Sequence, residues 1–217
     1  MHRWILGAPL LLALGSTAAA PLPACRAVVE RFVSADCPAC WAAGPAAAPP
    51  SQGVPFVLDW VVPTTADAAL EAAALVEAAE RLQRAGRLQP GSASEPAQRQ
   101  PLPRPPRVRL DVSIGPAWHG YFGVQLLLRG RPPTGSKGYV ALVEELPAGT
   151  DGSAVARTLV RSVAGPLNLD AATPGRPLRH LQSLSWPETA QPQRLSARGW
   201  VERPDGRVLA VAGGPCR

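Results

Sequence analysis

Apolar residues dominate two stretches near the start of the chain. Residues 27–33 (AVVERFV) and 54–62 (VPFVLDWVV) are rich in β-branched and aromatic side chains, which is typical of strands buried on both faces. Between them Pro38 suits the first turn of a helix, and a cluster of Gly and Pro at residues 44–50 predicts that this helix ends early. The pattern therefore predicts a strand–helix–strand unit.

An Ala-rich segment follows the second strand and predicts one long helix over residues 66–87. Thr64 and Asp67 form a start that resembles a capping box, and Gly86 is a plausible stop. The helix would bury a stripe made of Leu70, Leu75, Ala78 and Leu82. Residues 20–88 are thus predicted to form a βαβα unit.

The pattern changes after this helix. Residues 89–107 contain six prolines and almost no apolar side chains, so we predict an extended linker without a packed element. From residue 108 apolar and polar residues alternate, as in a strand with one buried face. Further strands are expected at 121–129, 139–146, 194–202 and 208–212, whereas residues 155–190 give no clear assignment. We therefore predict an α+β protein in which a small antiparallel β-sandwich, residues 108–217, follows the βαβα unit.

The first residues have the pattern of an export signal. His2 and Arg3 precede an apolar run at 4–14, and small residues occupy 16–20, so we predict a signal peptide, residues 1–19, cleaved after Ala19. The run is too short to cross a bilayer. The protein is accordingly expected in the periplasm or outside the cell, and the alternative is a lipoprotein acylated on Cys25.

Charge and composition exclude some classes of partner. The chain has 22 Lys and Arg against 16 Asp and Glu, a net charge of +6, which falls to +5 when Arg3 leaves with the signal peptide. The arginines are scattered singly, so no basic stripe indicates a nucleic-acid partner. No later apolar stretch is long enough for a transmembrane segment. The oligomeric state is not predicted.

Four cysteines remain after cleavage, at positions 25, 37, 40 and 216. An even number of cysteines in an exported chain indicates disulfides. Three pairings are possible. The short spacing favours a local Cys37–Cys40 bridge, which leaves Cys25 to pair with Cys216 as a structural disulfide that closes nearly the whole chain.

The residues around the first cysteine pair resemble a known family. Val28 to Cys40 (VVERFVSADCPAC), Val57 to Trp60 (VLDW) and Val140 to Glu144 (VALVE) resemble the secreted thioredoxin-like proteins of domain-of-unknown-function family 1223. The resemblance implies a thioredoxin-like fold for residues 20–88, in a shortened form. Thioredoxin-like enzymes also place a cis-Pro before a later strand, and we predict no such strand in residues 88–107.

The Cys-x-x-Cys pair (CxxC) indicates thiol–disulfide chemistry. At a strand-to-helix junction the first thiolate is stabilised by free N–H groups, so Cys37 is the expected attacking sulfur and Cys40 the resolving one. Asp59 is the candidate proton acceptor. The expected partners are protein thiols or disulfides. No cofactor or metal is predicted, because His119 and His180 are not at ligand spacing from the cysteines.

Two alternatives stay open. Both disulfides are structural in the first alternative, and the protein is then a non-catalytic envelope binding or structural module. The second concerns an aromatic cluster formed by Trp118, His119, Tyr121 and Phe122. It is either a contact patch on the surface or the mouth of the sandwich core.

Overall fold

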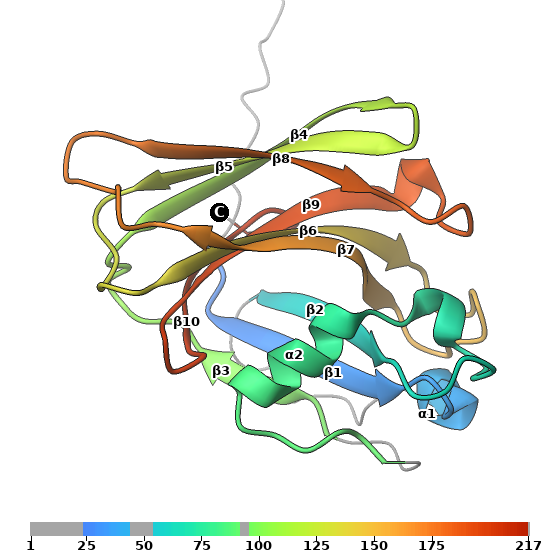
Figure 1. Cartoon of the computed structure of the whole chain (residues 1–217). Helices are drawn as coiled ribbons and strands as arrows, with labels where there is room; N and C mark the ends of the chain where they lie inside the picture. Colours follow the sequence, from blue (N-terminus) through green and yellow to red (C-terminus); the bar gives the residue numbers. More distant parts are fainter. Residues whose placement is uncertain (1–23, 44–53, 92–95, 217) are drawn as a thin grey trace, which may run out of the picture.

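The computed structural model of the chain describes residues 24–43, 54–91 and 96–216, so the predicted signal peptide lies outside the described residues. These residues form a mixed α+β fold in which strands predominate (Figure 1). The helical elements are α1 (Pro38–Ala43), η1 (Glu71–Ala73), α2 (Val76–Arg84) and η2 (Pro192–Arg194). The strands are β1 (Ala27–Ser34), β2 (Pro55–Val62), β3 (Gln98–Pro101), β4 (Arg109–Trp118), β5 (Tyr121–Arg129), β6 (Lys137–Leu146), β7 (Arg157–Asn168), β8 (Leu178–Ser185), β9 (Leu195–Glu202) and β10 (Val208–Ala212).

A seven-stranded mixed sheet forms the centre of the molecule, in the order β10-β9-β6-β7-β2-β1-β3. β1 and β2 are parallel over eight residue pairs, from Ala27 opposite Pro55 to Ser34 opposite Val62. β2 meets β7, also parallel, at Asp59 and Leu159. The remaining pairs in this sheet are antiparallel. One sheet therefore runs from the segment 20–88 into the segment 108–217.

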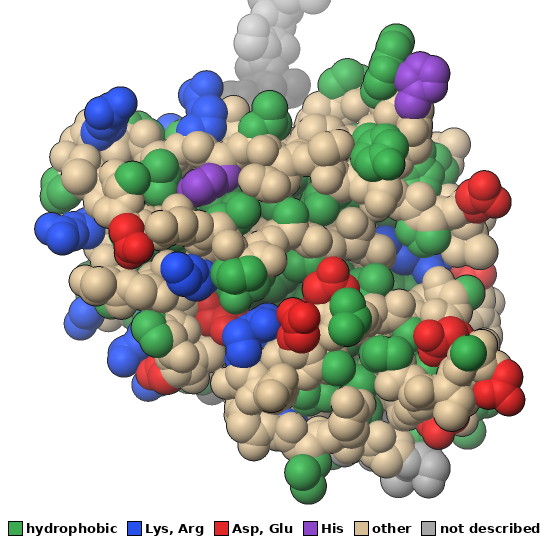
Figure 2. Space-filling model, in the orientation of Figure 1, with side chains coloured by type: hydrophobic (Ala, Val, Ile, Leu, Met, Phe, Trp, Pro, Cys, Tyr) green, Lys and Arg blue, Asp and Glu red, His purple; other side chains and the backbone are tan. Residues whose placement is uncertain are grey.

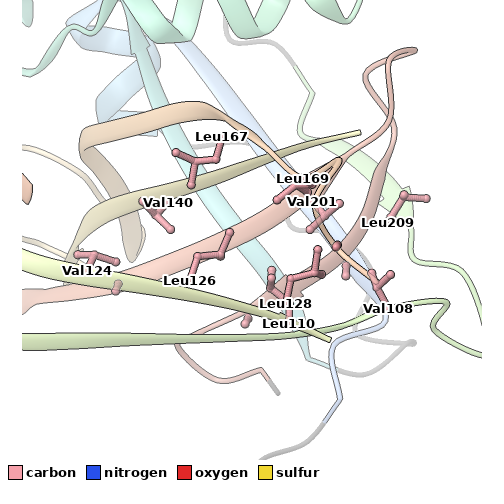
Figure 3. Packing of buried hydrophobic residues seen from close by; sticks show 14 of the residues in the cluster. Val108, Leu110, Val124, Leu126, Leu128, Val140, Leu167, Leu169, Val201 and Leu209 are labelled. Atoms are coloured by element: carbon pink, nitrogen blue, oxygen red, sulfur yellow. The ribbon is translucent and has the colours of Figure 1, made fainter. Parts of the chain in front are cut away.

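The fold has three layers because both faces of the large sheet are covered (Figure 1). α2 lies on one face, where Ala78 and Leu82 pack with Phe56, Leu58 and Trp60 of β2. The sheet β4-β5-β8 lies on the other face, over β6, β9 and β10. Figure 3 shows apolar side chains from both sheets meeting between these layers.

The central strand β6 is apolar from Tyr139 to Val143 because both of its faces are covered. Tyr139, Ala141 and Val143 belong to the core on the α2 side. Val140 and Leu142 belong to the core under the small sheet. Successive side chains point to opposite faces, and both faces are covered, so every position from 138 to 144 is buried.

The coarse prediction of an α+β fold is confirmed, and so are the parallel strands on either side of a short helix. The long helix predicted over 66–87 is wrong. Only Glu71–Ala73 and Val76–Arg84 are helical. The Leu75 N–H bonds to the carbonyl of Val61 at 3.1 Å, and Ala74 bridges to Val61. These bonds to the end of β2 interrupt the helix at Ala74 and Leu75, where the sequence favoured its continuation.

The prediction that residues 89–107 hold no packed element is also wrong. β3 pairs antiparallel with β1, with Glu30 opposite Gln98 and Ala27 opposite Pro101. β3 is the edge of the large sheet, where a Pro is tolerated because no neighbour requires its missing N–H. The unassigned residues 155–190 contain β7 and β8.

Candidate functional site

Cys37 and Cys40 lie where β1 passes into α1. The chain leaves β1 at Ser34, and the N–H of Cys37 donates to the carbonyl of Ser34 at 3.0 Å, which closes a turn before Pro38 begins the helix. The two cysteines form a disulfide with 5.3 Å between their Cα atoms. The N–H of Cys40 donates to Sγ of Cys37 at 3.2 Å.

This disulfide is buried in an apolar setting. Cys37 is 5% and Cys40 6% exposed. The surrounding cluster includes Val33, Ala35, Trp41, Val61, Leu146 and Leu159. Such surroundings favour the neutral disulfide over a charged thiolate, so reaction at these sulfurs requires local opening.

Trp41 and the loop before β7 cover the helix that carries Cys40. The Trp41 indole N–H donates to the carbonyl of Asp151 at 2.7 Å, and the Ala154 N–H donates to the carbonyl of Ala42 at 2.9 Å. The Arg157 guanidinium lies 4.6 Å from the centre of the Trp41 ring and also donates to the Trp41 carbonyl. We call these contacts the Trp41 clamp.

Asp59 supports this clamp from the middle of β2. Its side chain is 2% exposed and pairs with Arg31 and, at 3.2 Å, with Arg157. It also accepts the Thr158 N–H at 2.6 Å. Burial lowers the pKa of Arg157, and the charge of Asp59 opposes that effect. Asp59, the predicted proton acceptor, is thus engaged by two arginines and one backbone N–H.

Cys25 and Cys216 form the second disulfide, with 5.1 Å between their Cα atoms. This is the pairing that the cysteine spacing favoured. Cys25 precedes β1 and Cys37 follows it, so the two disulfides lie at opposite ends of an eight-residue strand, roughly 25 Å apart at about 3.3 Å per residue. A disulfide at Cys25 leaves that sulfur unavailable for a lipid, which favours the disulfide over the lipoprotein alternative.

The residues of the predicted aromatic cluster differ in burial. Phe122 is 8% exposed and packs against Trp186 in the core. Trp118 and Tyr121 are 74% and 51% exposed at the tip of the β4–β5 hairpin. His119 contacts Trp118, with 4.9 Å between the ring centres. Phe122 thus belongs to the core under the small sheet, whereas Trp118 and Tyr121 lie on the surface.

Sequence reasoning missed Trp41, Arg31 and Arg157 as neighbours of the site. Arg31 and Asp59 lie opposite each other in the β1–β2 register, so a parallel pairing of the two predicted strands would have indicated that contact. Arg157 comes from a strand that was not predicted, and no local pattern indicates its position.

Within residues 24–43, 54–91 and 96–216, no three His, Cys, Asp or Glu side chains gather as a metal site. None of the helices in the same ranges has the length and apolar character needed to cross a membrane.

The fold and the cysteine pair define a mixed α+β protein with a buried disulfide at a strand-to-helix junction. No protein-family model, curated protein or solved structure matches the chain. The resemblance to family 1223 therefore stays a prediction from the residues quoted above.

Proposed function

We propose that this protein is an exported thiol–disulfide oxidoreductase, with a thioredoxin-like unit that uses Cys37 and Cys40 on protein thiols or disulfides. The observation that carries the proposal is the Cys37–Cys40 disulfide between β1 and α1, with the Cys40 N–H directed at Sγ of Cys37. That N–H would stabilise negative charge on Cys37 after reduction, which is the condition for an attacking thiolate.

The arrangement of strands around β1 supports the thioredoxin-like part of the proposal. β1 has a parallel partner on one side, β2, and an antiparallel partner on the other, β3. Because β3 runs against β1, its first residue lies toward the end of β1 that carries the cysteines. Pro96 precedes β3 by two residues. In thioredoxin-like enzymes the proline at this place is cis, whereas the cis X-Pro bonds found in the described residues are Arg104–Pro105 and Gly165–Pro166.

The exchange consists of two displacement steps. The reduced Cys37 thiolate attacks one sulfur of a substrate disulfide, forms a mixed disulfide and releases the other substrate sulfur as a thiolate that takes up a proton. The Cys40 thiolate then attacks Cys37, which re-forms the Cys37–Cys40 bond and releases the second substrate thiol. Two electrons pass to the substrate, and an external thiol must reduce the Cys37–Cys40 bond again.

The second candidate function is a non-catalytic module with two structural disulfides. The Trp41 clamp favours it, because the clamp covers α1 and the cysteines have little exposed surface. The two functions differ in reduction potential. Structural disulfides lie below about −300 mV, whereas oxidoreductases range from about −270 to −120 mV. Equilibration of the purified protein with glutathione buffers measures this potential.

Reduction of insulin by dithiothreitol, followed as turbidity, tests the activity. We expect the wild-type protein to accelerate the reaction and Cys37→Ser to give the rate of dithiothreitol alone. Cys40→Ser is the matched control, because it removes the same bridge but keeps the attacking sulfur. It should accumulate as a mixed disulfide with insulin that Cys37→Ser does not form. A wild-type rate equal to dithiothreitol alone, without any mixed disulfide in Cys40→Ser, would establish the structural module.

A further inference from the structure

The segments that form the sheet β4-β5-β8 carry most of the net positive charge of the protein. Residues 107–131 and 176–186, which contain these strands, hold six of the 22 Lys and Arg and one of the 16 Asp and Glu. The rest of the chain is nearly balanced, at 16 against 15. The one acidic residue, Asp111, is paired with Arg129.

Strand alternation places the arginines of these strands, Arg109, Arg129 and Arg179, on the side away from the core. In β5 the even positions from Phe122 to Leu128 are buried, whereas Tyr121 and Arg129 are exposed. In β8 the odd positions, including Arg179 and Leu181, are exposed. Arg109 begins β4 opposite Arg129. Within the described residues Arg109 and Arg179 have no carboxylate partner.

The other end of the same face is aromatic. Trp118 and Tyr121 lie opposite each other and are joined by the two-residue turn His119-Gly120. Both turn residues have positive φ, +45° and +81°, as the tightest hairpin turn requires. His is one of the non-Gly residues enriched at positive φ, so the turn presents an imidazole beside two exposed aromatic rings.

Figure 2 shows this separation along the upper edge of the molecule, where Lys and Arg side chains gather at one end and hydrophobic and His side chains project at the other. Tyr121 and Arg129 are eight residues apart on β5, which is roughly 26 Å at about 3.3 Å per residue. Between the two ends the face is mostly small or polar, with Ser113, Gly123, Gln125 and Ser183, apart from Leu181, which is 70% exposed opposite Gln125.

We propose that this face docks on an anionic phospholipid bilayer, with Trp118 and Tyr121 entering the interface and Arg109 and Arg179 contacting lipid phosphates. Trp and Tyr are the side chains that favour the membrane–water interface, and arginines add attraction to anionic lipid. A protein partner would need a continuous patch of about 800 Å² with an apolar centre. Two small anchor sites separated by polar residues suit a fluid lipid surface better.

Flotation with large unilamellar vesicles tests the proposal. The chain used begins at Ala20, so that the apolar run at 4–14 does not itself enter the vesicles, and it keeps every described element. We expect binding to vesicles of phosphatidylcholine and phosphatidylglycerol at 3:1, and none to phosphatidylcholine alone. Arg109→Gln/Arg179→Gln should weaken binding about tenfold or more. The matched control is Arg203→Gln/Arg207→Gln, which removes the same charge at the β9–β10 turn and should change binding less than about threefold by the same estimate.

Two further measurements test the contribution of Trp118 and Tyr121 at the hairpin tip. Trp118→Ser/Tyr121→Ser should also weaken binding about tenfold, because it removes the interfacial anchors. Brominated lipids should quench the tryptophan fluorescence of Trp186→Phe and not that of Trp118→Phe/Trp186→Phe, since Trp186 is partly exposed beside the hairpin turn and the remaining Trp41, Trp60 and Trp200 are at most 5% exposed. Far-UV circular dichroism and the thermal midpoint establish that each variant is folded.

Three results would overturn the proposal. The first is no binding to phosphatidylglycerol vesicles at low salt. The second is an equal loss of binding in the test and control arginine pairs, which would indicate net charge alone. The third is self-association that requires Trp118, in the absence of vesicle binding, which would assign the tip to a second copy of the chain.

Discussion

Replacing Arg81 by Met should remove a buried ionic link between α2 and both β1 and β9. Arg81 lies on α2 with a side chain that is 4% exposed. Its Nε and Nη2 donate to the two oxygens of Glu30 on β1, at 3.0 and 2.9 Å. Its Nη1 pairs with Glu202 on β9 at 2.7 Å and donates to the carbonyl of Gly206 at 3.2 Å.

The expected loss in the free energy of unfolding arises because Arg81→Met leaves two buried carboxylates without their main partner. Met keeps much of the side-chain volume, so the main effect is electrostatic. Glu30 loses both guanidinium bonds and keeps one from the Trp60 indole N–H. Glu202 is left with Arg84 at 3.4 Å. Removing one partner of a buried ion pair costs about 3–5 kcal/mol, which is a large part of the roughly 5–15 kcal/mol typical of a folded domain.

The loss should depend on pH in a defined direction. Burial already raises the pKa of Glu202 above its ordinary value, and Arg81 and Arg84 oppose that rise. Without Arg81 the pKa should rise further, so the folded variant binds protons more tightly than the unfolded chain. A raised folded pKa favours the folded state below the ordinary Glu value of about 4.3 and loses that contribution as pH rises through the raised value. The deficit of Arg81→Met should therefore be largest near neutral pH and shrink on acidification.

Urea unfolding followed by tryptophan fluorescence, at pH 7 and near pH 4.5, measures both effects. Arg84→Met is the control, because that side chain is 33% exposed and should cost no more than about 1 kcal/mol. The triple variant Arg81→Met/Glu30→Gln/Glu202→Gln should regain most of the loss, since it leaves no buried charge. A loss below about 1 kcal/mol in Arg81→Met, or no recovery in the triple variant, would refute the electrostatic account.

Two further predictions concern the disulfide at the chain ends and the buried tyrosine. Cys25→Ser/Cys216→Ser opens a loop with a sequence separation of 191 residues. In the chain-entropy model this should lower the free energy of unfolding, measured by urea unfolding, by about 5 kcal/mol. A loss under about 1 kcal/mol would contradict that model for this protein. Burial raises the pKa of Tyr139, so its contribution to stability is present below the ordinary value of about 10 and is lost as pH rises toward the raised value. Tyr139→Phe should lack that alkaline decline in urea midpoints between pH 8.5 and 10.5, and an equal decline in both proteins would contradict the assignment.

Local sequence patterns predicted those strands whose own apolar residues indicate burial. The apolar runs at 27–33 and 54–62 became β1 and β2 within one residue at each end, and 121–129 and 208–212 coincide with β5 and β10. The patterns failed where a distant partner decides the conformation. Residues 98–101 (QRQP) carry no strand signal, yet β3 forms because the edge of β1 offers hydrogen bonds. Leu75 likewise bonds to Val61 and interrupts a segment with high helix propensity.

In the candidate site, too, some residues are indicated by the local sequence and others depend on distant strands. The CxxC motif and its position after a buried strand are local, so the sequence indicated Cys37 and Cys40 directly. The clamp over them depends on Arg157, which reaches Trp41 and Asp59 across about 100 residues of sequence separation. Such a contact requires the pairing of β2 with β7, and no single-sequence pattern predicts which strands pair at that distance.

The pairing of β2 with β7 also places Arg157, the residue whose guanidinium covers Trp41 next to the cysteine pair. Arg157 lies on β7, and its guanidinium is held by Asp59 of β2 and Ser153 of the preceding loop while it covers Trp41 of α1. A strand from the second part of the chain therefore supplies the group that keeps α1 closed. The Trp41 clamp is held together by contacts with the large sheet, so under the proposed function it would have to loosen before a substrate reaches the Cys37–Cys40 bond. The strands that follow residue 108 thus supply contacts that cover the cysteine pair, and under the proposed function residues 20–88 alone would lack them.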